Sequence, residues 1–267
     1  MTMLNKSKLK PMQNNSTEPT SQGNFSASEM AKFDQLAESW WDPQGKYKTA
    51  LEFNRVRVTY FIAQICLFYK RDADQQFPLR GLKILDVGCG GGLVCEALAK
   101  AGADVVGIDV SEMSVEVAKR HAIKSELVIE YRHEHAQQTC ENATHSYDVV
   151  INAEVIEHVP DQAALVKQCS QLTKVNGCLV MATLNRTIKS YVVGIIGAEY
   201  IMRYLPIGTH RWSEFVKPTE LDNMADMAAM QCLTKIGMAY NLFTKTWRTT
   251  ADLGVNYVHV YKKTCHS

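Results

Sequence analysis

A short apolar segment that runs directly into four glycines constrains this chain more than any other feature of its sequence. Residues 84–92 read ILDVGCGGG, between a predicted strand, Lys83–Val87, and a predicted helix, Leu93–Ala101. A loop of this kind lies at the carboxyl end of a parallel sheet, where glycine lets a ligand approach the main chain without a Cβ in the way. The alternative is a tight turn that binds nothing.

The residues around the glycines indicate which ligand the loop would bind. A dinucleotide-binding fold has the pattern GxGxxG, but Leu93 occupies the third glycine position here, and Asp86 stands two residues before Gly88. This carboxylate repels a pyrophosphate and attracts the ammonium and sulfonium groups of S-adenosylmethionine (SAM). Asp109 ends the next predicted strand 21 residues after Gly88, close to the ~20 residues typical of a carboxylate that binds ribose hydroxyls. The pattern favours SAM over a nicotinamide or flavin.

Strand patterns alternate with helix patterns through the middle of the chain. Such alternation implies right-handed crossovers and a doubly wound parallel sheet. Two later strands, Met238–Thr246 and Asn256–Lys262, have a connection too short for a helical crossover, so we expect an antiparallel pair at the sheet edge. The other predicted elements are the strands Asp104–Asp109, Val128–Tyr131, Tyr147–Asn152 and Cys178–Leu184 and the helices Glu112–Lys124 and Gln162–Leu172.

The N-terminal region and the overall composition limit the alternatives. Residues 1–25 are polar with no apolar core, which predicts a disordered tail rather than a signal peptide; helices are expected over Ser28–Trp41 and Leu51–Tyr69. Lys and Arg number 29 against 28 Asp and Glu, which argues against nucleic-acid binding. No two of the eight cysteines have CxxC spacing, so no zinc or redox dithiol site is indicated and a reducing compartment is expected.

With these residues established, the chain from about Lys32 to Tyr261 resembles the ubiquinone biosynthesis O-methyltransferases. The glycine loop alone would indicate only a class I methyltransferase. Several sequence motifs, in the same order as in the family, are more specific. They are Phe33 with Ser39-Trp40-Trp41-Asp42, LDVGCGGG, Tyr147-Asp148-Val149-Val150, Glu154-x-x-Glu157-His158-Val159, Thr183-Leu184-Asn185-Arg186, Gly197-Ala198-Glu199-Tyr200-Ile201 and Phe215-Val216-Lys217-Pro218.

The resemblance implies a Rossmann-like class I methyltransferase fold, with a seven-stranded, mostly parallel sheet and one antiparallel edge strand. Residues 26–267 would form this domain, with an N-terminal helical cap and an apolar insert around residues 187–215. The implied reaction is SAM-dependent O-methylation of a polyprenylated catechol or hydroxyphenol and of 3-demethylubiquinol. The implied cofactor-binding residues are Arg57, Gly88, Asp109 and Ala153.

The cluster Glu154, Glu157 and His158 is a candidate metal site. Spacings of i, i+3 and i+4 would put the three on one helical face. Two carboxylates and an imidazole suit a magnesium-like ion that keeps several waters, and the resemblance implies such a Mg²⁺ site. The alternative is that they cap the helix or bond to neighbouring loops. His210 is a second candidate base or a surface histidine, so no catalytic base is assigned.

The segment Ser190–Leu205 is apolar apart from Glu199 and Arg203. It is too short to span a bilayer. It fits an amphipathic segment in the headgroup region, which would give a polyprenyl tail access to the site, and it fits equally a helix that covers the core. The first alternative predicts a cytoplasmic enzyme, peripheral on the inner face of the inner membrane (the matrix side in a mitochondrion), with other ubiquinone-biosynthesis proteins as candidate partners.

Two rival functions are also compatible with the sequence. A class I methyltransferase acting on another small phenol would keep the glycine loop and Asp109 without needing the apolar segment. A SAM-binding subunit of a membrane assembly that does not turn the cofactor over is the non-enzymatic rival. Retention of Asp86, Asp109 and the Glu-x-x-Glu-His cluster argues against this second rival.

Overall fold

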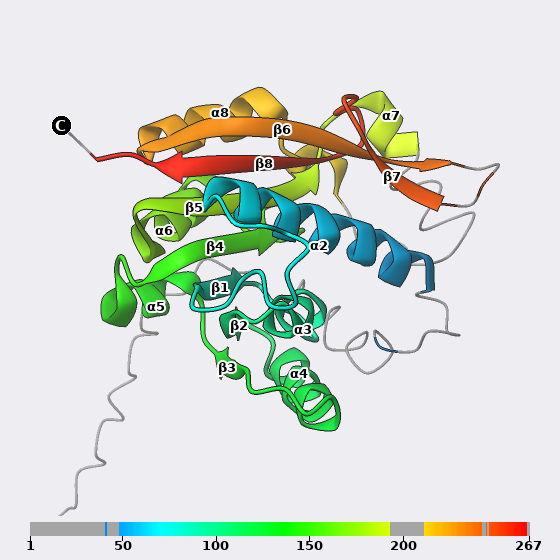
Figure 1. Ribbon diagram of the computed structural model, residues 1–267. Coiled ribbons are helices and arrows are strands. Elements are labelled where there is room, and N and C mark those ends of the chain that lie inside the picture. Colours follow the sequence, from blue (N-terminus) through cyan, green and yellow to red (C-terminus); the bar gives the residue numbers. More distant parts are fainter. Residues whose placement is uncertain (1–40, 42–47, 193–210, 242–243, 245, 266–267) are drawn as a thin grey trace, which may run out of the picture.

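The computed structural model describes residue 41 and residues 48–192, 211–241, 244 and 246–265. Within these ranges the strands form a single sheet (Figure 1). The eight strands are β1 (Lys83–Val87), β2 (Asp104–Asp109), β3 (Glu130–His133), β4 (Tyr147–Ala153), β5 (Thr173–Leu184), β6 (Met230–Asn241), β7 (Thr246–Thr250) and β8 (Asn256–Lys263).

The strand order β3-β2-β1-β4-β5-β8-β6-β7 combines a parallel part with an antiparallel part. Strands β1 to β5 are parallel, while β8 pairs antiparallel with both β5 and β6, and β7 pairs antiparallel with β6. The mostly parallel sheet is therefore confirmed, but the expected count of seven is wrong by one in the described part of the chain. The extra strand is β7, whose residues were predicted as the end of the preceding strand or as its connection.

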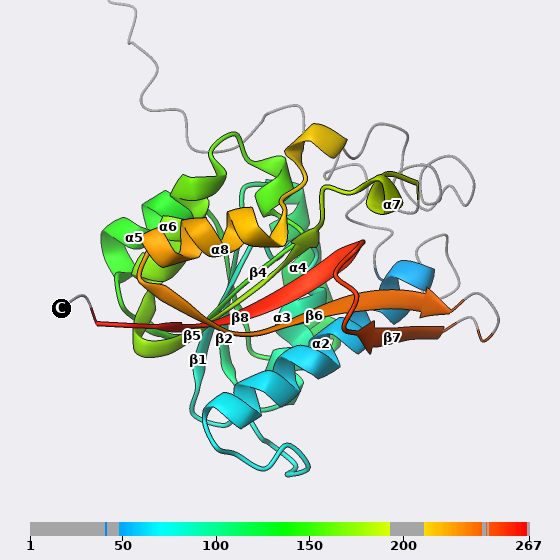
Figure 2. The same cartoon turned by 90° about the horizontal axis from the view of Figure 1, so that it is seen from above.

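Helices cover both faces of the sheet, in three layers (Figure 2). Helices α2, α3 and α4 pack on one face, and α5, α6 and α8 pack on the other. The helices and short helical turns of the described ranges are α2 (Lys48–Phe68), α3 (Leu93–Lys100), α4 (Glu112–Lys124), α5 (Ala136–Ala143), η2 (Ile156–His158), α6 (Gln162–Leu172), α7 (Ile188–Ser190), η4 (Trp212–Glu214) and α8 (Pro218–Met227).

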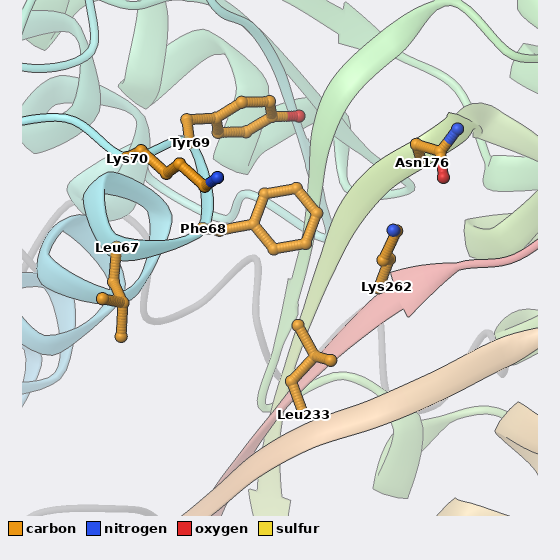
Figure 3. A pocket seen from close by; sticks show the side chains of 7 residues that line it. All are labelled: Leu67, Phe68, Tyr69, Lys70, Asn176, Leu233 and Lys262. Atoms are coloured by element: carbon orange, nitrogen blue, oxygen red, sulfur yellow. The ribbon is translucent and has the colours of Figure 1, made fainter.

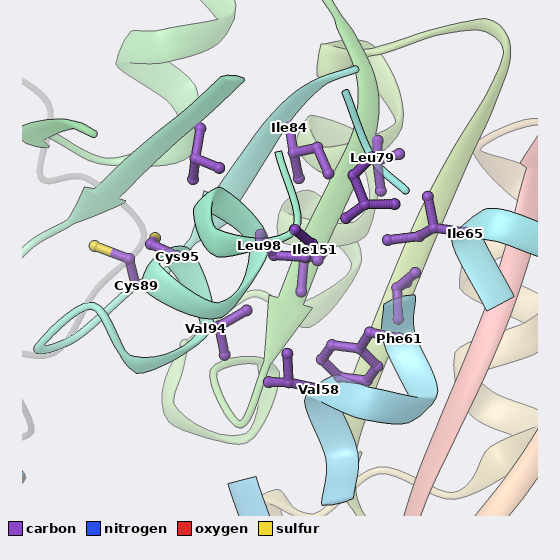
Figure 4. Packing of buried hydrophobic residues seen from close by; sticks show 14 of the residues in the cluster. Val58, Phe61, Ile65, Leu79, Ile84, Cys89, Val94, Cys95, Leu98 and Ile151 are labelled. Atoms are coloured by element: carbon purple, nitrogen blue, oxygen red, sulfur yellow. The ribbon is translucent and has the colours of Figure 1, made fainter. Parts of the chain in front are cut away.

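Strands buried on both faces explain why the central segments are apolar without alternation. Ile84 of β1 belongs to the core cluster under α2 and α3 (Figure 4), whereas the next residue, Leu85, belongs to the cluster under α6 and α8. Burying a side chain of this size stabilises the fold by roughly 1.5–3 kcal/mol. Both residues are fully buried, so β1 is fixed between the two layers, and the loop that follows it has a fixed starting point.

Local sequence accounts for where the helices begin. Ser111 caps α4 by accepting a hydrogen bond from the Ser114 N–H (3.0 Å), and Asp161 caps α6 by accepting one from the Ala164 N–H (2.9 Å). These side chains satisfy amides that have no partner inside the helix. Pro218 stands in the first turn of α8, where its missing N–H costs nothing.

Most predicted elements are confirmed, although two strands, β5 and β6, begin several residues earlier than expected. The helix expected over Leu51–Tyr69 is α2, β3 begins two residues later than expected, and β6 begins eight residues earlier. The tail 1–25, nearly all of the helix Ser28–Trp41 and most of Ser190–Leu205 lie outside the described residues. Helices α5 and α8 were not predicted, whereas the predicted strands and helices of the described ranges occur in the expected order.

Candidate functional site

The glycine loop between β1 and α3 is tied to β2 by its own backbone. The N–H groups of Gly88 and Cys89 both donate to the carbonyl of Ile108, at 2.8 and 2.9 Å. Gly88 has a φ of +78°, which L side chains rarely adopt, and a Cβ there would lie 2.3 Å from Cγ2 of Val155. Glycine is thus required both for the turn and for the close approach of the residues that follow β4.

Asp109, the predicted ribose acid, is held in a fixed orientation at the end of β2. Its Oδ2 accepts a hydrogen bond from the Gly90 N–H and its Oδ1 one from the Ser111 N–H, both at 2.8 Å. The carboxylate therefore connects the glycine loop to the start of α4. Such a fixed carboxylate at the carboxyl end of the second strand is suited to orient the hydroxyls of a ribose.

Asp86 is buried beneath the same loop, with 2 % of its surface exposed. The Cys95 thiol donates to its Oδ2 at 3.3 Å. Burial raises the pKa of Asp86 to about 7, a rise that the Cys95 hydrogen bond and the nearby Arg57 partly oppose and that Asp109 increases. Since the pKa lies near neutrality, the negative charge inferred from the sequence depends on pH in the physiological range.

Arg57 extends from α2 toward the same end of the sheet. Its Nη1 donates to Oε1 of Glu154 at 3.1 Å and its Nη2 to Oδ1 of Asn54 at 2.8 Å. Its guanidinium also lies 5.0 Å from the ring centroid of Phe53, a cation–π distance. A predicted cofactor residue and a predicted metal ligand therefore form an ion pair, although 97 residues separate them in the chain.

The Glu154, Glu157 and His158 cluster does not lie on one helical face, so that part of the prediction is wrong. Glu154 directly follows β4 with a φ of +57°, which interrupts any helix that includes it. Only the single turn η2 follows, and the regular helix α6 begins at Gln162. Glu154 and Glu157 nevertheless lie close enough to interact, since the charge on Glu154 contributes to raising the pKa of Glu157.

Glu157 is the most constrained member of this cluster. It is buried, and its Oε2 accepts a hydrogen bond from Oγ1 of Thr183 at 2.7 Å. Its Oε1 has no hydrogen-bond partner among the described residues. Burial, with the charge of Glu154, holds the pKa of Glu157 well above its usual range. A buried carboxylate oxygen of this kind fits a cation, which would supply the missing partner.

The ligand atoms of the three predicted residues do not all lie within 4.8 Å of one another. In the described ranges, the only three candidate side chains whose ligand atoms all lie within 4.8 Å of one another are Asp222, Cys232 and His259, on the far side of the sheet from α2. Glu154 and Glu157 by themselves suit Mg²⁺, which is often held by one or two carboxylates and keeps several waters. Two of the three predicted ligands, Glu154 and Glu157, are therefore suited to bind such an ion.

The predicted site residues gather at the carboxyl ends of β1, β2 and β4. Ala153 is the last residue of β4 and pairs with Ala182 of β5; with it lie Gly88, Asp109, Arg57 and the two glutamates described above. His210, the other candidate base, lies outside the described residues. Thr183 and Trp41 stand within the family motifs without a role inferred for them, and both contact this site.

A shallow groove, separate from this site, lies at the opposite end of the sheet. Figure 3 shows the side chains that line it. The groove lies between the end of α2, the start of β5, β6 and the end of β8. Its lining residues are Leu67, Phe68, Tyr69, Lys70, Asn176, Leu233 and Lys262. Because ligands of parallel α/β sheets bind outside the carboxyl ends of the strands, this groove is not the cofactor site.

Comparisons with known proteins agree with this geometry. A family model described as a methyltransferase domain matches residues 85–181. The fold resembles magnesium protoporphyrin IX methyltransferase from Synechocystis PCC 6803 with bound SAH (TM-score 0.63, 18 % identity, 89 % of this chain and 95 % of that chain). The fold and the site together define a class I SAM-dependent methyltransferase.

Close relatives narrow the class further. The chain is 42 % identical over 239 residues to a ubiquinone biosynthesis O-methyltransferase of Brucella ovis, covering 90 % of this chain and 96 % of the relative. It is 43 % identical over 236 residues to the protein of the same name from Pelagibacter ubique, covering 88 % and 97 %. The chain belongs to the family of ubiquinone biosynthesis O-methyltransferases, and it is a SAM-dependent O-methyltransferase.

Proposed function

We propose that this protein transfers the methyl group of SAM to phenolic hydroxyls of polyprenylated ubiquinone precursors, namely a polyprenyl catechol or hydroxyphenol and 3-demethylubiquinol. The observation that carries the proposal is the meeting of the glycine loop, Asp86 and Asp109 with Arg57 and the glutamate pair at one end of the sheet. Family membership supports the choice of acceptor. Residues 26–267 form the methyltransferase domain in this proposal.

Methyl transfer to a phenol has two requirements. The cofactor supplies an electrophilic methyl group on a sulfonium, and the acceptor oxygen must lie in line with it. A phenol has a pKa near 10 and is mostly protonated at neutral pH, so the site must also favour the phenolate. In the proposed arrangement Asp109 and Gly88 orient the cofactor, Asp86 attracts its positive charge, and the glutamate pair lies beside the acceptor.

We assign the glutamate pair as the magnesium site, with His158 beside it. A divalent ion there would stabilise a bound phenolate. Two observations support the assignment. Oε1 of Glu157 lacks a hydrogen-bond partner among the described residues. Glu154 has a positive φ, which is unfavourable for residues other than glycine. Glu154 also forms an ion pair with Arg57, with Nη1 3.1 Å from Oε1.

The metal assignment is tested by binding as well as by activity. Titration calorimetry with Mg²⁺ should give a signal in the wild type that is lost in Glu157→Gln. Glu130→Gln, which changes an exposed glutamate of β3, is the matched control and should bind like the wild type. Activity that survives exhaustive chelation, or a Glu157→Gln variant that binds Mg²⁺ normally, contradicts the assignment.

We also propose a peripheral contact with the membrane through the insert around residues 187–215. No helix in the described ranges has the length and hydropathy to cross a bilayer. The residues that border the undescribed part of the insert expose apolar side chains: Ile188 is 80 % exposed and Val192 49 %, and Tyr191 packs edge-on against Trp212 at 6.3 Å. Apolar side chains exposed together suit a lipid interface.

Vesicle flotation distinguishes this contact from a helix that only covers the core. The double variant Ile195→Glu/Ile201→Glu should lose binding to vesicles of bacterial phospholipids. Leu67→Glu is the control, because Leu67 is 71 % exposed in the groove at the opposite end of the sheet. Equal flotation of all three proteins removes the membrane contact and with it the proposed location on the inner face of the inner membrane.

The acceptor itself is tested with purified protein, SAM and a substrate panel. Mass spectrometry should detect one methylated product for each S-adenosylhomocysteine released from polyprenylated catechols, with much lower rates for catechols that lack the tail. Equal rates for both would favour a methyltransferase of small phenols. Cofactor binding without any S-adenosylhomocysteine formation would favour a non-catalytic subunit.

A further inference from the structure

Trp41 contacts the cofactor loop directly from outside the glycine motif. Its indole Nε1–H donates to the carbonyl of Gly91 at 2.8 Å, across 50 residues of sequence. Gly91 lies in the middle of the loop between β1 and α3. The N-terminal part of the chain therefore supplies a hydrogen-bond donor that fixes one peptide group of this loop.

The indole ring of Trp41 is itself held in place by stacking. It lies flat on the imidazole of His121 in α4, with ring centroids 3.4 Å apart and planes 7° from parallel. Nδ1 of His121 contacts Oε1 of Glu96, a residue of α3 with 1 % of its surface exposed. Trp41 thus touches the glycine loop and α4 directly, and α3 through His121.

The glycine loop is held from two sides as a result. On one side the Gly90 N–H donates to Asp109, the carboxylate assigned to the ribose. On the other side the next residue, Gly91, accepts from Trp41. Glycines have more backbone freedom than other residues, so a run of them needs such external bonds to keep a single conformation. A loop fixed in advance loses less entropy when it binds a ligand.

We propose that Trp41 is a positioning residue for the cofactor: its indole N–H and its stack on His121 hold the glycine loop in the conformation that binds SAM. Trp41 does not contact the reacting atoms in this role. It acts through Gly91 and, by way of Gly90, through Asp109. The inference rests on the assignment of the glycine loop as the cofactor site, which cofactor binding by the wild type tests separately.

The test uses Trp41→Phe, which keeps an aromatic ring for the stack and removes the N–H donor together with the five-membered ring of the indole. Titration calorimetry of the full chain with SAM and with S-adenosylhomocysteine should show dissociation constants about three- to tenfold higher, the effect of losing one neutral hydrogen bond. In steady-state kinetics the KM for SAM should rise by a similar factor, while the KM for the acceptor stays unchanged.

Trp212→Phe is the matched control. The Trp212 indole also donates to a backbone carbonyl, that of Thr187, at 2.9 Å, but it does not belong to the glycine-loop contacts. The Trp212→Phe substitution should leave the dissociation constant of S-adenosylhomocysteine unchanged. A second variant, His121→Ala, leaves Trp41 intact and removes the surface on which it stacks, and it should weaken cofactor binding at least as much as Trp41→Phe.

Tryptophan fluorescence gives a readout that a purely structural role would not change. Addition of S-adenosylhomocysteine should alter the emission of the wild type and of Trp212→Phe but not that of Trp41→Phe. Wild-type cofactor affinity in Trp41→Phe overturns the proposal, and so does an equal loss in the Trp212→Phe control. If Trp41→Phe fails to fold, wild-type affinity in His121→Ala overturns it.

Discussion

Replacement of the buried carboxylate of Asp86 by an amide should make the protein more stable and a weaker binder of SAM. Asp86→Asn keeps the size and shape of the side chain and its ability to accept the hydrogen bond from Cys95. It removes the charge, which is buried under the glycine loop, and replaces one carboxylate oxygen with an amide NH2 group. The same charge therefore opposes folding and favours the cationic cofactor.

The magnitude of the stability effect follows from the pKa of Asp86. Burial raises this pKa from 3.8 to about 7. The folded protein therefore binds more protons than the unfolded chain between about pH 4 and pH 7, and stability is lost as the pH rises through that window. A difference of about three pH units corresponds to about 4 kcal/mol at pH 8. Because the amide of Asp86→Asn does not titrate, the variant should not lose this stability as the pH rises.

Urea unfolding at pH 4 and pH 8 measures the effect. The free energy of unfolding of Asp86→Asn relative to the wild type should increase by several kcal/mol from the lower to the higher pH. Calorimetry at pH 8 should at the same time show SAM binding weakened by about tenfold or more. Asp104→Asn, at an exposed aspartate of β2, is the control. A relative stability that does not change with pH refutes the reasoning.

Other substitutions test the remaining contacts. Gly88→Ala should lose several kcal/mol of stability, measured by thermal unfolding, because of the positive φ and the clash with Val155; Gly88→Ala/Val155→Ala should recover only the part due to the clash. Thr183→Val should cost about 1–3 kcal/mol in urea unfolding, because Glu157 loses its hydrogen bond inside the fold. Burial lowers the pKa of Lys263 to about 8, so the unfolded chain binds more protons above pH 8 and stability should rise from there toward pH 10, a rise that Lys263→Met should abolish.

The parallel half of the fold could be predicted because local signals there are strong. β1, β2, α4 and α6 have the expected bounds, since apolar runs, capping residues and glycines mark their ends. The antiparallel half was less predictable. β6 alternates exposed and half-buried residues over its first half, and the polar segment TWRTT of β7 is stabilised by pairing with β6 rather than by its own pattern.

The site could be predicted only where it depends on local sequence. Gly88 and Asp109 follow from the loop and the strand ends, but the ion pair between Arg57 and Glu154 depends on tertiary packing across 97 residues. The helical spacing of Glu154 and Glu157 was misleading because the chain turns with a positive φ at Glu154. The contact between Trp41 and the glycine loop likewise depends on folding of the whole domain.

The position of β8 has a consequence for how the polypeptide folds during synthesis. β8 follows β6 and β7 in the chain but lies between β5 and β6, paired with both. Until it has left the ribosome, β5 presents an unpaired and largely apolar edge, and an open edge of this kind pairs readily with other chains. Nascent chains that stall before Asn256 should therefore depend on chaperones to avoid aggregation, even with the entire glycine loop already made.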